Sequence, residues 1–338
     1  MLLASCGGPK SAFEYDAPVS PAIETKALVR EFGDGLRAVD GIDLAVPAGE
    51  IYGFLGPNGA GKTTTVRILT TLLRPSGGTA LVAGHDVADD PAAVRRSIGV
   101  ALQEAALDPL MTGRELLNLQ ATLHGIDRSA IPGLSESLLV RVGLTDAADR
   151  RVGTYSGGMR RRLDLASALV HEPEVLFLDE PTTGLDPVSR QAIWAEVEKL
   201  NAEGTTVFLT TQYLEEADQL ADRVGIIAKG RIVAEGTPTQ LKAEVGAPHL
   251  EVSIGGGDSE QDRATAVLAR FGKELPPRDG RLLVELEGGA SQTPAVVRAL
   301  DEEGLQVESL DVVEPTLDDV FVSRTGEHLE GDEVVEPD

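Results

Sequence analysis

Glycine, lysine and threonine recur at close spacing between residues 56 and 63, where the chain reads Gly-Pro-Asn-Gly-Ala-Gly-Lys-Thr. Glycines allow backbone N–H groups to turn inward, which creates a concave site for an anion. At this spacing Lys62 would reach the β- and γ-phosphates of a nucleotide, and the Thr63 hydroxyl would ligate Mg²⁺. The sequence therefore predicts a phosphate-binding loop made of Gly56, Pro57, Asn58, Gly59, Ala60, Gly61, Lys62 and Thr63, with Thr64 directly after it.

Two acidic residues follow a second apolar run further along the chain. Residues 175–178 read Val-Leu-Phe-Leu, and Asp179 and Glu180 come directly after them. Ligand sites in open α/β sheets gather at the carboxyl ends of the strands. We therefore expect Asp179 to hold Mg²⁺ through its water shell, and Glu180 to polarise the water that attacks the terminal phosphate.

The phosphate loop needs a strand before it and a helix after it, and the sequence predicts both. Residues 51–55 form a short apolar run typical of a buried strand, and residues 63–73 have helical spacing. Alternating apolar residues at 23–29 and 39–46 predict antiparallel strands with one wet face. Later segments alternate strand and helix, which predicts an α/β fold with a parallel core sheet. The strands are expected at 174–178, 205–209 and 224–228, and the helices at 187–202 and 213–221.

Two further parts of the chain differ from this alternating core. Residues 104–158 contain helical segments and no strong strand signal, so we expect a helical subdomain there, with helices at 111–123, 134–142 and 146–150. After residue 245 the pattern predicts a small acidic α+β domain, with strands at 249–254, 281–286 and 306–313 and helices at 259–271, 291–303 and 315–323. The expected order is a disordered leader at 1–22, a nucleotide-binding unit at 23–245, the small domain at 246–325 and a solvated acidic tail at 326–338.

With these motifs the sequence closely resembles the ATP-binding cassette (ABC) family over roughly residues 23–245. Residues 155–160, which read Tyr-Ser-Gly-Gly-Met-Arg, are similar to the family's signature motif and follow the helical segment, as in these ATPases. Gln103 lies where the family has its Q-loop glutamine, and Asp186 lies in a Gly-Leu-Asp similar to the D-loop. Phe32 lies where an aromatic residue usually stacks on adenine. The resemblance implies a P-loop NTPase fold of the ABC type, with its antiparallel β and helical subdomains.

The signature-like loop would form a second anion cradle in the same chain. Its serine and the N–H groups of its glycines precede a helix, and a helix N-terminus favours an anion. One chain already has a phosphate loop, so the second cradle makes sense if it caps the γ-phosphate held by another chain. The resemblance implies that answer, because two cassettes of this family meet head to tail around two ATPs. We therefore expect a homodimer in which the partner's ATP is bound by Ser156, Gly157, Gly158 and Met159.

The resemblance also assigns the catalytic roles and contains one departure. It implies hydrolysis of ATP through Glu180 and Lys62, with Mg²⁺ held by Thr63, Gln103 and Asp179. The family usually has a histidine after the next strand, whereas this chain has Gln212. A glutamine amide can donate to a phosphate oxygen and accept from water, but it cannot become cationic. Two interpretations stay open: Gln212 is a working catalytic substitute, or the site is a slow one that clamps ATP.

Composition excludes several classes of partner. The 338 residues contain 30 Lys and Arg against 55 Asp and Glu, a net charge of −25, and residues 246–338 contribute −15 of it. This acidity disfavours nucleic acid or an anionic membrane as the main partner. The single Cys6 excludes an internal disulfide framework and a cysteine zinc site. The stretch before Cys6 is similar to a lipoprotein box, but it lacks the basic region and the long apolar run of a secretory signal. A disordered leader is therefore the preferred interpretation.

The sequence also resembles one subfamily, the ATPase subunits of daunorubicin/doxorubicin-resistance exporters. The likeness lies in residues 210–222 and in residues 314–321, which read Glu-Pro-Thr-Leu-Asp-Asp-Val-Phe. No apolar run approaches the ~18 residues that span a bilayer. The resemblance therefore implies peripheral attachment at the cytoplasmic face of the cell membrane, through a separate integral membrane permease, and no direct membrane insertion. Residues 109–112 are a candidate docking edge or simply a helix N-terminus.

Other functions compete with drug export at this stage. One is a soluble ABC ATPase in translation or DNA maintenance, but such relatives usually carry two cassettes or a long coiled coil. Another is a slow regulatory nucleotide binder, which Glu180 disfavours. The small domain could support assembly, sense a ligand or only stabilise the fold. Neither the transported compound nor the role of this domain follows from the sequence.

Overall fold

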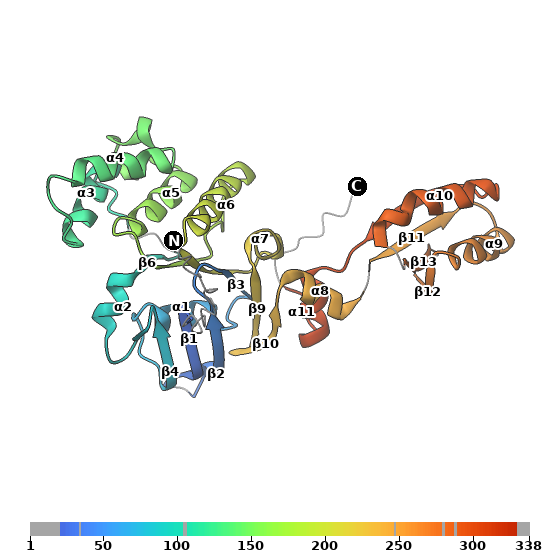
Figure 1. Ribbon diagram of the computed structural model, residues 1–338, viewed down its shortest axis with the longest axis horizontal. Coiled ribbons are helices and arrows are strands. Elements are labelled where there is room, and N and C mark those ends of the chain that lie inside the picture. Colours follow the sequence, from blue (N-terminus) through green and yellow to red (C-terminus); the bar gives the residue numbers. More distant parts are fainter. Residues whose placement is uncertain are drawn as a thin grey trace, which may run out of the picture.

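The computed structural model describes residues 21–33, 35–103, 107–246, 248–278, 281–286 and 289–329. Figure 1 shows a large nucleotide-binding unit and, beside it, a small sheet with two helices near the end of the chain. Most of the predicted leader and tail, and the start of the predicted helical subdomain, lie outside the described residues. Within the described part of the chain, no helix is both long enough and apolar enough to cross a bilayer.

A six-stranded sheet forms the centre of the large unit, and its strand order is β10-β9-β3-β8-β7-β6. All neighbouring pairs are parallel except β9 with β10, so the prediction of a parallel core is confirmed. The strands are β3 (Ile51–Leu55), β6 (Ile98–Ala101), β7 (Val175–Asp179), β8 (Thr206–Thr211), β9 (Arg223–Ala228) and β10 (Arg231–Gly236).

Burial on both faces explains why the central strands read as continuous apolar runs. On one face, alternate residues such as Leu176 and Leu178 pack under the helical side of the molecule. On the other face, Phe54, Phe177 and Phe208 pack together, with ring centroids 5.5–5.6 Å from Phe208. The carboxyl ends of these strands are therefore fixed from above and below.

The predicted antiparallel strands near the N-terminus are confirmed and belong to a second sheet of order β2-β1-β4-β5. Its strands are β1 (Ile23–Glu31), β2 (Arg37–Val46), β4 (Gly77–Val82) and β5 (His85–Asp86). Helix α1 (Lys62–Leu69) ends four residues earlier than predicted, and α2 (Pro91–Ser97) follows β5. Apolar residues of this sheet share one core with β3, β7 and β8.

Helices cover the other side of the central sheet. They are α3 (Gly113–Leu123), α4 (Ile131–Arg141), α5 (Gly157–Ala168), α6 (Pro187–Ala202) and α7 (Leu214–Leu220). Thr112 and Glu115 form a capping box that starts α3, which explains its sharp beginning. The helix predicted at 146–150 is wrong: only the short 3₁₀ turns η1 (Thr145–Ala147) and η2 (Val152–Thr154) lie in this region.

The small sheet near the end of the chain has the order β12-β13-β11-β14, with all pairs antiparallel. It comprises β11 (His249–Ile254), β12 (Gly272–Arg278), β13 (Arg281–Leu286) and β14 (Val307–Val313). Helices α9 (Asp258–Leu268) and α10 (Thr293–Glu302), with the 3₁₀ turn η3 (Gly289–Gln292), accompany it. Strand β12 was not predicted because Pro276 and Pro277 interrupt its pattern; an edge strand tolerates proline.

The last helix, α11 (Leu317–Thr325), packs against α8 (Pro238–Val245) and not against the small sheet (Figure 1). Val320 and Phe321 share a core with Leu55 and Leu241, so residues beyond the small sheet stabilise the large unit. The prediction of a solvated tail from residue 326 is wrong at Leu329. This side chain is buried in the same core, and its backbone N–H donates to Asp318.

Candidate functional site

The loop between β3 and α1 has the geometry of an anion cradle, and its glycines are there for steric reasons. Gly61 has φ of 112° and a Cβ there would lie 2.2 Å from the carbonyl oxygen of Ala38. A Cβ on Gly56 would lie 2.4 Å from the carbonyl oxygen of Ile227. Gly59 also has a positive φ, 79°, which glycine adopts at no steric cost. The loop ends where α1 begins, so its N–H groups and the helix N-terminus face the same site.

All the predicted phosphate-loop residues lie on this loop or in the first turn of α1. The loop tip is exposed at Asn58 and Gly59, Gly56 and Ala60 are buried, and Pro57 is half-buried. Thr63 and Thr64 are half-buried at the start of α1.

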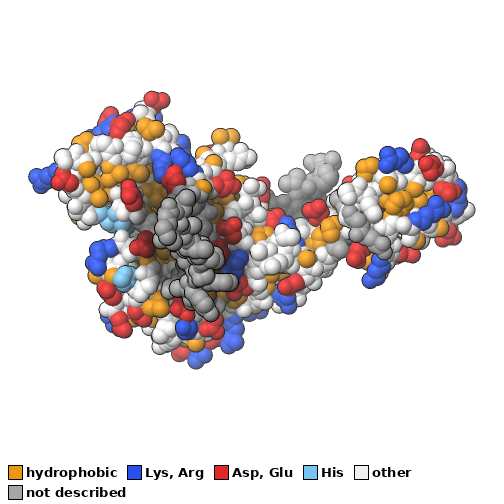
Figure 2. Space-filling view, in the orientation of Figure 1, with side chains coloured by type: hydrophobic (Ala, Val, Ile, Leu, Met, Phe, Trp, Pro, Cys, Tyr) orange, Lys and Arg blue, Asp and Glu red, His pale blue; other side chains and the backbone are white. Residues whose placement is uncertain are grey.

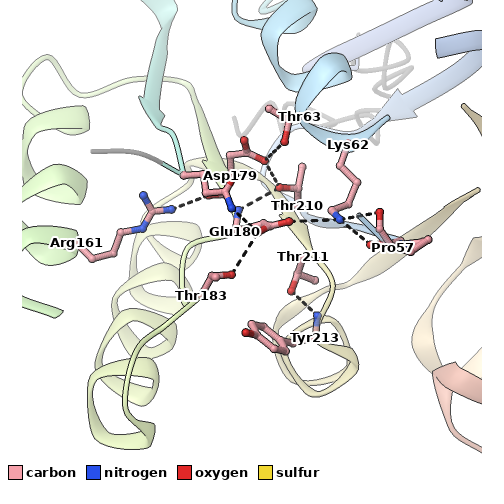
Figure 3. Close-up of polar contacts among 12 residues, drawn as sticks. Pro57, Lys62, Thr63, Arg161, Asp179, Glu180, Thr183, Thr210, Thr211 and Tyr213 are labelled. Carbon is pink, nitrogen blue, oxygen red and sulfur yellow. Dashed lines mark hydrogen bonds and ion pairs between the residues drawn. The ribbon is translucent and has the colours of Figure 1, made fainter. Parts of the chain in front are cut away.

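Lys62 is buried at the base of this cradle, where its ammonium group has three oxygen partners. Its Nζ donates to the carbonyl oxygens of Gly56, at 2.6 Å, and Pro57, at 3.2 Å, and lies 3.4 Å from Oε1 of Glu180 (Figure 3). Burial lowers the pKa of Lys62, and the nearby carboxylates of Glu180 and Asp179 oppose that shift. The lysine therefore joins the phosphate loop to the carboxylate pair of β7.

Asp179 is the last residue of β7 and faces the start of α1 (Figure 3). Its carboxylate accepts hydrogen bonds from Thr63 Oγ1, at 3.4 Å, and from Thr210 Oγ1 on the neighbouring strand β8. The site thus joins a hydroxyl of α1 to a carboxylate of β7, both hard oxygen donors of the kind that Mg²⁺ prefers. The residues present fit a magnesium ion bound with a nucleotide.

Glu180 is buried and adopts the left-handed conformation, with φ of 48°. Its N–H donates to both the carbonyl and the hydroxyl oxygen of Thr210, at 3.1 Å each, which holds this strained backbone in place. Its side chain accepts from Gln103 Nε2 at 3.1 Å and from Thr183 Oγ1 at 3.4 Å, in addition to the Lys62 contact. The carboxylate is therefore positioned by groups from three other segments.

Gln212 and Phe32 lie in this unit, but their predicted roles have less support. Gln212 follows β8, and its amide Oε1 is buried with no hydrogen-bond partner among the described residues. A buried acceptor without a partner fits a group that receives a hydrogen bond from bound water or ligand. Phe32 is 37% exposed, and the guanidinium of Arg30 lies 4.8 Å from its ring centroid. Adenine stacking on Phe32 stays a prediction.

The signature-like loop lies beside the predicted D-loop of the same chain. Ser156 caps α5 by accepting from the N–H of Met159 at 3.3 Å, and both Ser156 and Gly157 are exposed. Asp186 caps α6 and accepts from the N–H and hydroxyl of Ser189. A Cβ on Gly158 would lie 2.6 Å from Ser189 Oγ, so glycine allows this close approach. The start of the loop, at Ser156 and Gly157, is therefore accessible from solvent.

Sequence reasoning assigned no role to three residues that hold the site together. They are Thr210, which bonds Asp179 and Glu180; Thr183, which bonds Glu180; and Arg161, which donates to backbone carbonyls around them. Thr210 and Thr183 stand inside recognised motifs, but their partners depend on which strands are neighbours. For Arg161 the only available signal was a basic residue within a helix rich in arginine.

Two family models match parts of this chain, and a known protein is similar to most of it. A family model described as "ABC transporter" matches residues 39–183, and one described as "ATP-binding protein DrrA1-3-like, C-terminal domain" matches residues 236–325. The daunorubicin resistance ATP-binding protein DrrA2 of Streptomyces coeruleorubidus is 47% identical over 318 residues, which cover 93% of this chain and 98% of that protein. The chain belongs to the ABC transporter family. This ABC cassette is therefore an ATP-binding ATPase.

Other relatives and solved structures agree with this assignment. The doxorubicin resistance ATP-binding protein DrrA of Mycobacterium tuberculosis is 42% identical, covering 91% of this chain and 95% of that protein. The structure of cbiO1 from Clostridium perfringens is 28% identical with a TM-score of 0.61, covering 67% of this chain and 92% of that chain. A dimeric post-hydrolysis state of the cassette MJ0796, bound to ADP and phosphate, matches at 24% identity and a TM-score of 0.60 over 64% and 98%. At that identity the last similarity concerns the fold alone.

Proposed function

We propose that this ABC cassette is the ATP-hydrolysing subunit of an exporter, and that a separate membrane subunit provides the path for a drug or another hydrophobic compound. The proposal rests on the relatives that match nearly the whole chain, which are named for resistance to daunorubicin or doxorubicin. A protein of Burkholderia lata that is 44% identical over 236 residues is named for export of Nod factor. Removal of a compound from the cell would serve both the resistance that the first names state and the export that the last name states.

The observation that carries the catalytic part is the buried Glu180 carboxylate, held within 3.4 Å of the Lys62 ammonium. In the proposed reaction, Lys62 and the loop N–H groups bind the β- and γ-phosphates of ATP. Glu180 accepts a hydrogen bond from a water molecule and orients it toward the γ-phosphorus. The P–O bond to ADP breaks as the bond to the water oxygen forms, which yields ADP and phosphate.

Magnesium would be held at the Thr63–Asp179 pair, with Gln103 contributing from the Q-loop. When bound with ATP, the ion neutralises developing charge on the phosphate oxygens. Gln103 already donates to Glu180 at 3.1 Å, so a change in its loop would be felt by the catalytic carboxylate. Gln212 would orient the γ-phosphate or the water through its amide, without carrying a proton.

A head-to-tail homodimer is part of this proposal. Ser156, Gly157 and the N-terminus of α5 form an exposed anion cradle in a chain that already has a phosphate loop. A second copy could place this cradle over the γ-phosphate bound by the first copy, with Met159 and Asp186 at the same interface. Each ATP would then be enclosed by two chains.

The helical subdomain is the surface that we propose for the membrane subunit. Its exposed apolar side chains include Leu110, Leu119 and Leu123, which are 71%, 43% and 71% exposed, and Figure 2 shows hydrophobic side chains at the surface of this part. Leu110 belongs to the candidate docking edge at residues 109–112. This contact would place the cassette at the cytoplasmic face of the membrane without inserting it, in agreement with its acidity.

Transport by inverted membrane vesicles provides the test. The cassette is co-expressed with a candidate membrane subunit, and ATP hydrolysis and ATP-driven uptake of a fluorescent anthracycline are measured together. Lys62→Ala should lose ATP binding, whereas Glu180→Gln should bind ATP and lose hydrolysis and uptake. Hydrolysis by the wild type without uptake of any hydrophobic probe would refute export and leave the catalytic assignment standing.

A further inference from the structure

Arg161 is a buried arginine of α5 and lies five residues after Ser156. Its side chain extends to the carboxyl end of β7. Only 8% of the surface of this residue is exposed. Nη2 donates to the carbonyl oxygen of Asp179 at 2.8 Å (Figure 3). Nε donates to the carbonyl oxygen of Pro181 at 2.9 Å. These two carbonyls belong to the residues immediately before and after Glu180.

The third nitrogen of the same guanidinium faces another functional segment. Nη1 donates to the carbonyl oxygen of Leu102, the residue immediately before Gln103, and lies 3.3 Å from Oδ2 of Asp164. This one side chain of α5 therefore bonds the backbone next to Glu180 and also the backbone next to Gln103, which donates to Glu180. The planar fork of arginine can make these divergent bonds at once, whereas a lysine ammonium is a single point charge.

The burial of this charge is costly, and its partners show how the cost is offset. Burial lowers the pKa of Arg161, and the carboxylate of Asp164 opposes that shift most strongly. Glu180 meanwhile has a left-handed backbone, a conformation that persists only where its surroundings enforce it. The two carbonyls that Arg161 holds are the flanks of that strained residue.

We propose that Arg161 is a positioning residue for ATP hydrolysis, which fixes the backbone on both sides of Glu180 and next to Gln103 relative to the signature helix. This inference rests on the proposed catalytic role of Glu180. It gives the cassette a direct intrachain connection between the cradle that would cap the partner's ATP and the carboxylate that orients water on its own ATP. A displacement of α5 would therefore move the catalytic carboxylate.

The same helix provides a matched control. Arg162 also donates to two backbone carbonyls, those of Val142 at 2.9 Å and Gly143 at 3.3 Å. Those carbonyls belong to the end of α4 and the turn after it, within the helical subdomain. An arginine that only stabilises the fold should behave like Arg162.

The test compares Arg161→Lys and Arg161→Gln with Arg162→Lys and Arg162→Gln in the full-length cassette. Melting temperature, Kd for ATP, KM and kcat are measured for each. We expect both Arg161 variants to bind ATP within about threefold of the wild type and to lose roughly tenfold or more in kcat, since misplacement of a catalytic group by about 1 Å can cost 10²-fold. The Arg162 variants should keep kcat within about twofold at a similar melting temperature.

A second readout separates positioning from general damage. In a Glu180→Gln background, Arg161→Lys should cause little further loss of kcat, because the group that it positions is already gone. A kcat equal to that of the Arg162 variants, or a further multiplicative loss in this background, would overturn the proposal. So would failure of both Arg161 variants to fold while the Arg162 variants fold. If the Glu180→Gln chain hydrolyses ATP as the wild type does, the proposed catalytic role itself fails.

Discussion

The hydroxyl of Thr182 donates at 2.9 Å to Oε1 of Glu216, a carboxyl that is completely buried in α7. The same oxygen accepts from the indole N–H of Trp194 on α6 at 3.0 Å. One carboxyl of α7 therefore ties the loop that follows Glu180 to the helix that follows the D-loop. Burial raises the pKa of Glu216, which favours its protonated form.

This relationship predicts a difference between two substitutions of the same residue. Glu216→Ala leaves the buried donors of Thr182 and Trp194 without an acceptor, which should cost about 2–4 kcal/mol of unfolding free energy. Glu216→Gln keeps an acceptor oxygen and resembles the protonated acid, so it should change stability by less than about 1 kcal/mol. Urea unfolding followed by tryptophan fluorescence measures both. Equal losses in the two variants would contradict this role.

Gln212 allows a direct choice between a working site and a slow clamp. If its amide orients water or phosphate, Gln212→His should keep ATPase activity, because histidine can also donate and accept. Gln212→Ala should lose most of the activity, by about 10²-fold, as expected for the loss of one positioned hydrogen-bonding group. Steady-state phosphate release with saturating MgATP measures this. An alanine variant with unimpaired turnover would exclude any role for position 212.

The α/β core could be predicted from the sequence because central strands buried on both faces read as unbroken apolar runs. Phe177 and Leu178 face opposite cores, and both are buried. The phosphate loop was predictable for a similar reason: at Gly56 and Gly61 a side chain would collide with backbone carbonyls. Local sequence and tertiary constraint agree at these positions.

The contacts that complete the site could not be predicted in this way. Arg161 bonds three backbone carbonyls, and any residue type supplies a carbonyl, so no pattern of side chains marks its partners. Thr210 contacts Asp179 only because β8 lies next to β7 in the sheet. Leu329 was assigned to a tail because the residues around it are acidic, yet its burial depends on a core formed by distant helices.

Asp164 provides a pH test of the environment around Arg161. Burial raises the pKa of Asp164 from its ordinary 3.8 to about 6, although Arg161 acts against the shift. At Asp164 the folded state therefore retains a proton that the unfolded chain releases, so the contribution of this residue to stability falls as the pH rises from 4 to 7. Asp164→Asn removes that cost, and its stability relative to the wild type should improve by about 2 kcal/mol over this range.

Chemical unfolding at pH 4, 5, 6 and 7 measures this effect as a difference between two chains. Asp146→Asn, which removes an exposed carboxylate, is the control for the loss of an acidic group at the surface. A stability difference between Asp164→Asn and the wild type that is constant with pH would show that Asp164 titrates normally.

Complementation tests the head-to-tail dimer without the membrane subunit. Lys62→Ala disables the phosphate loop, and Ser156→Arg blocks the cradle that would cap the partner's ATP. Each homodimer then lacks both sites, whereas a mixed dimer retains one intact site. In an equal mixture about half of the dimers are mixed, so about a quarter of wild-type sites should be active. ATPase activity that stays at the level of the separate variants would contradict shared sites.

The packing of α11 changes how the small domain should be removed. Deleting residues 246–338 would remove Val320 and Phe321 from the core that they share with Leu55 and Leu241, so it would damage the cassette itself. Replacing residues 248–313 by a flexible linker keeps α11 beside α8. We expect this chain to retain ATP binding and, if the small domain supports assembly, to lose co-purification with the membrane subunit.

A Phe321→Ala chain that keeps the small domain should be less stable by about 3–5 kcal/mol and, where folded, should still co-purify. Full co-purification of the linker chain would assign assembly to the cassette alone.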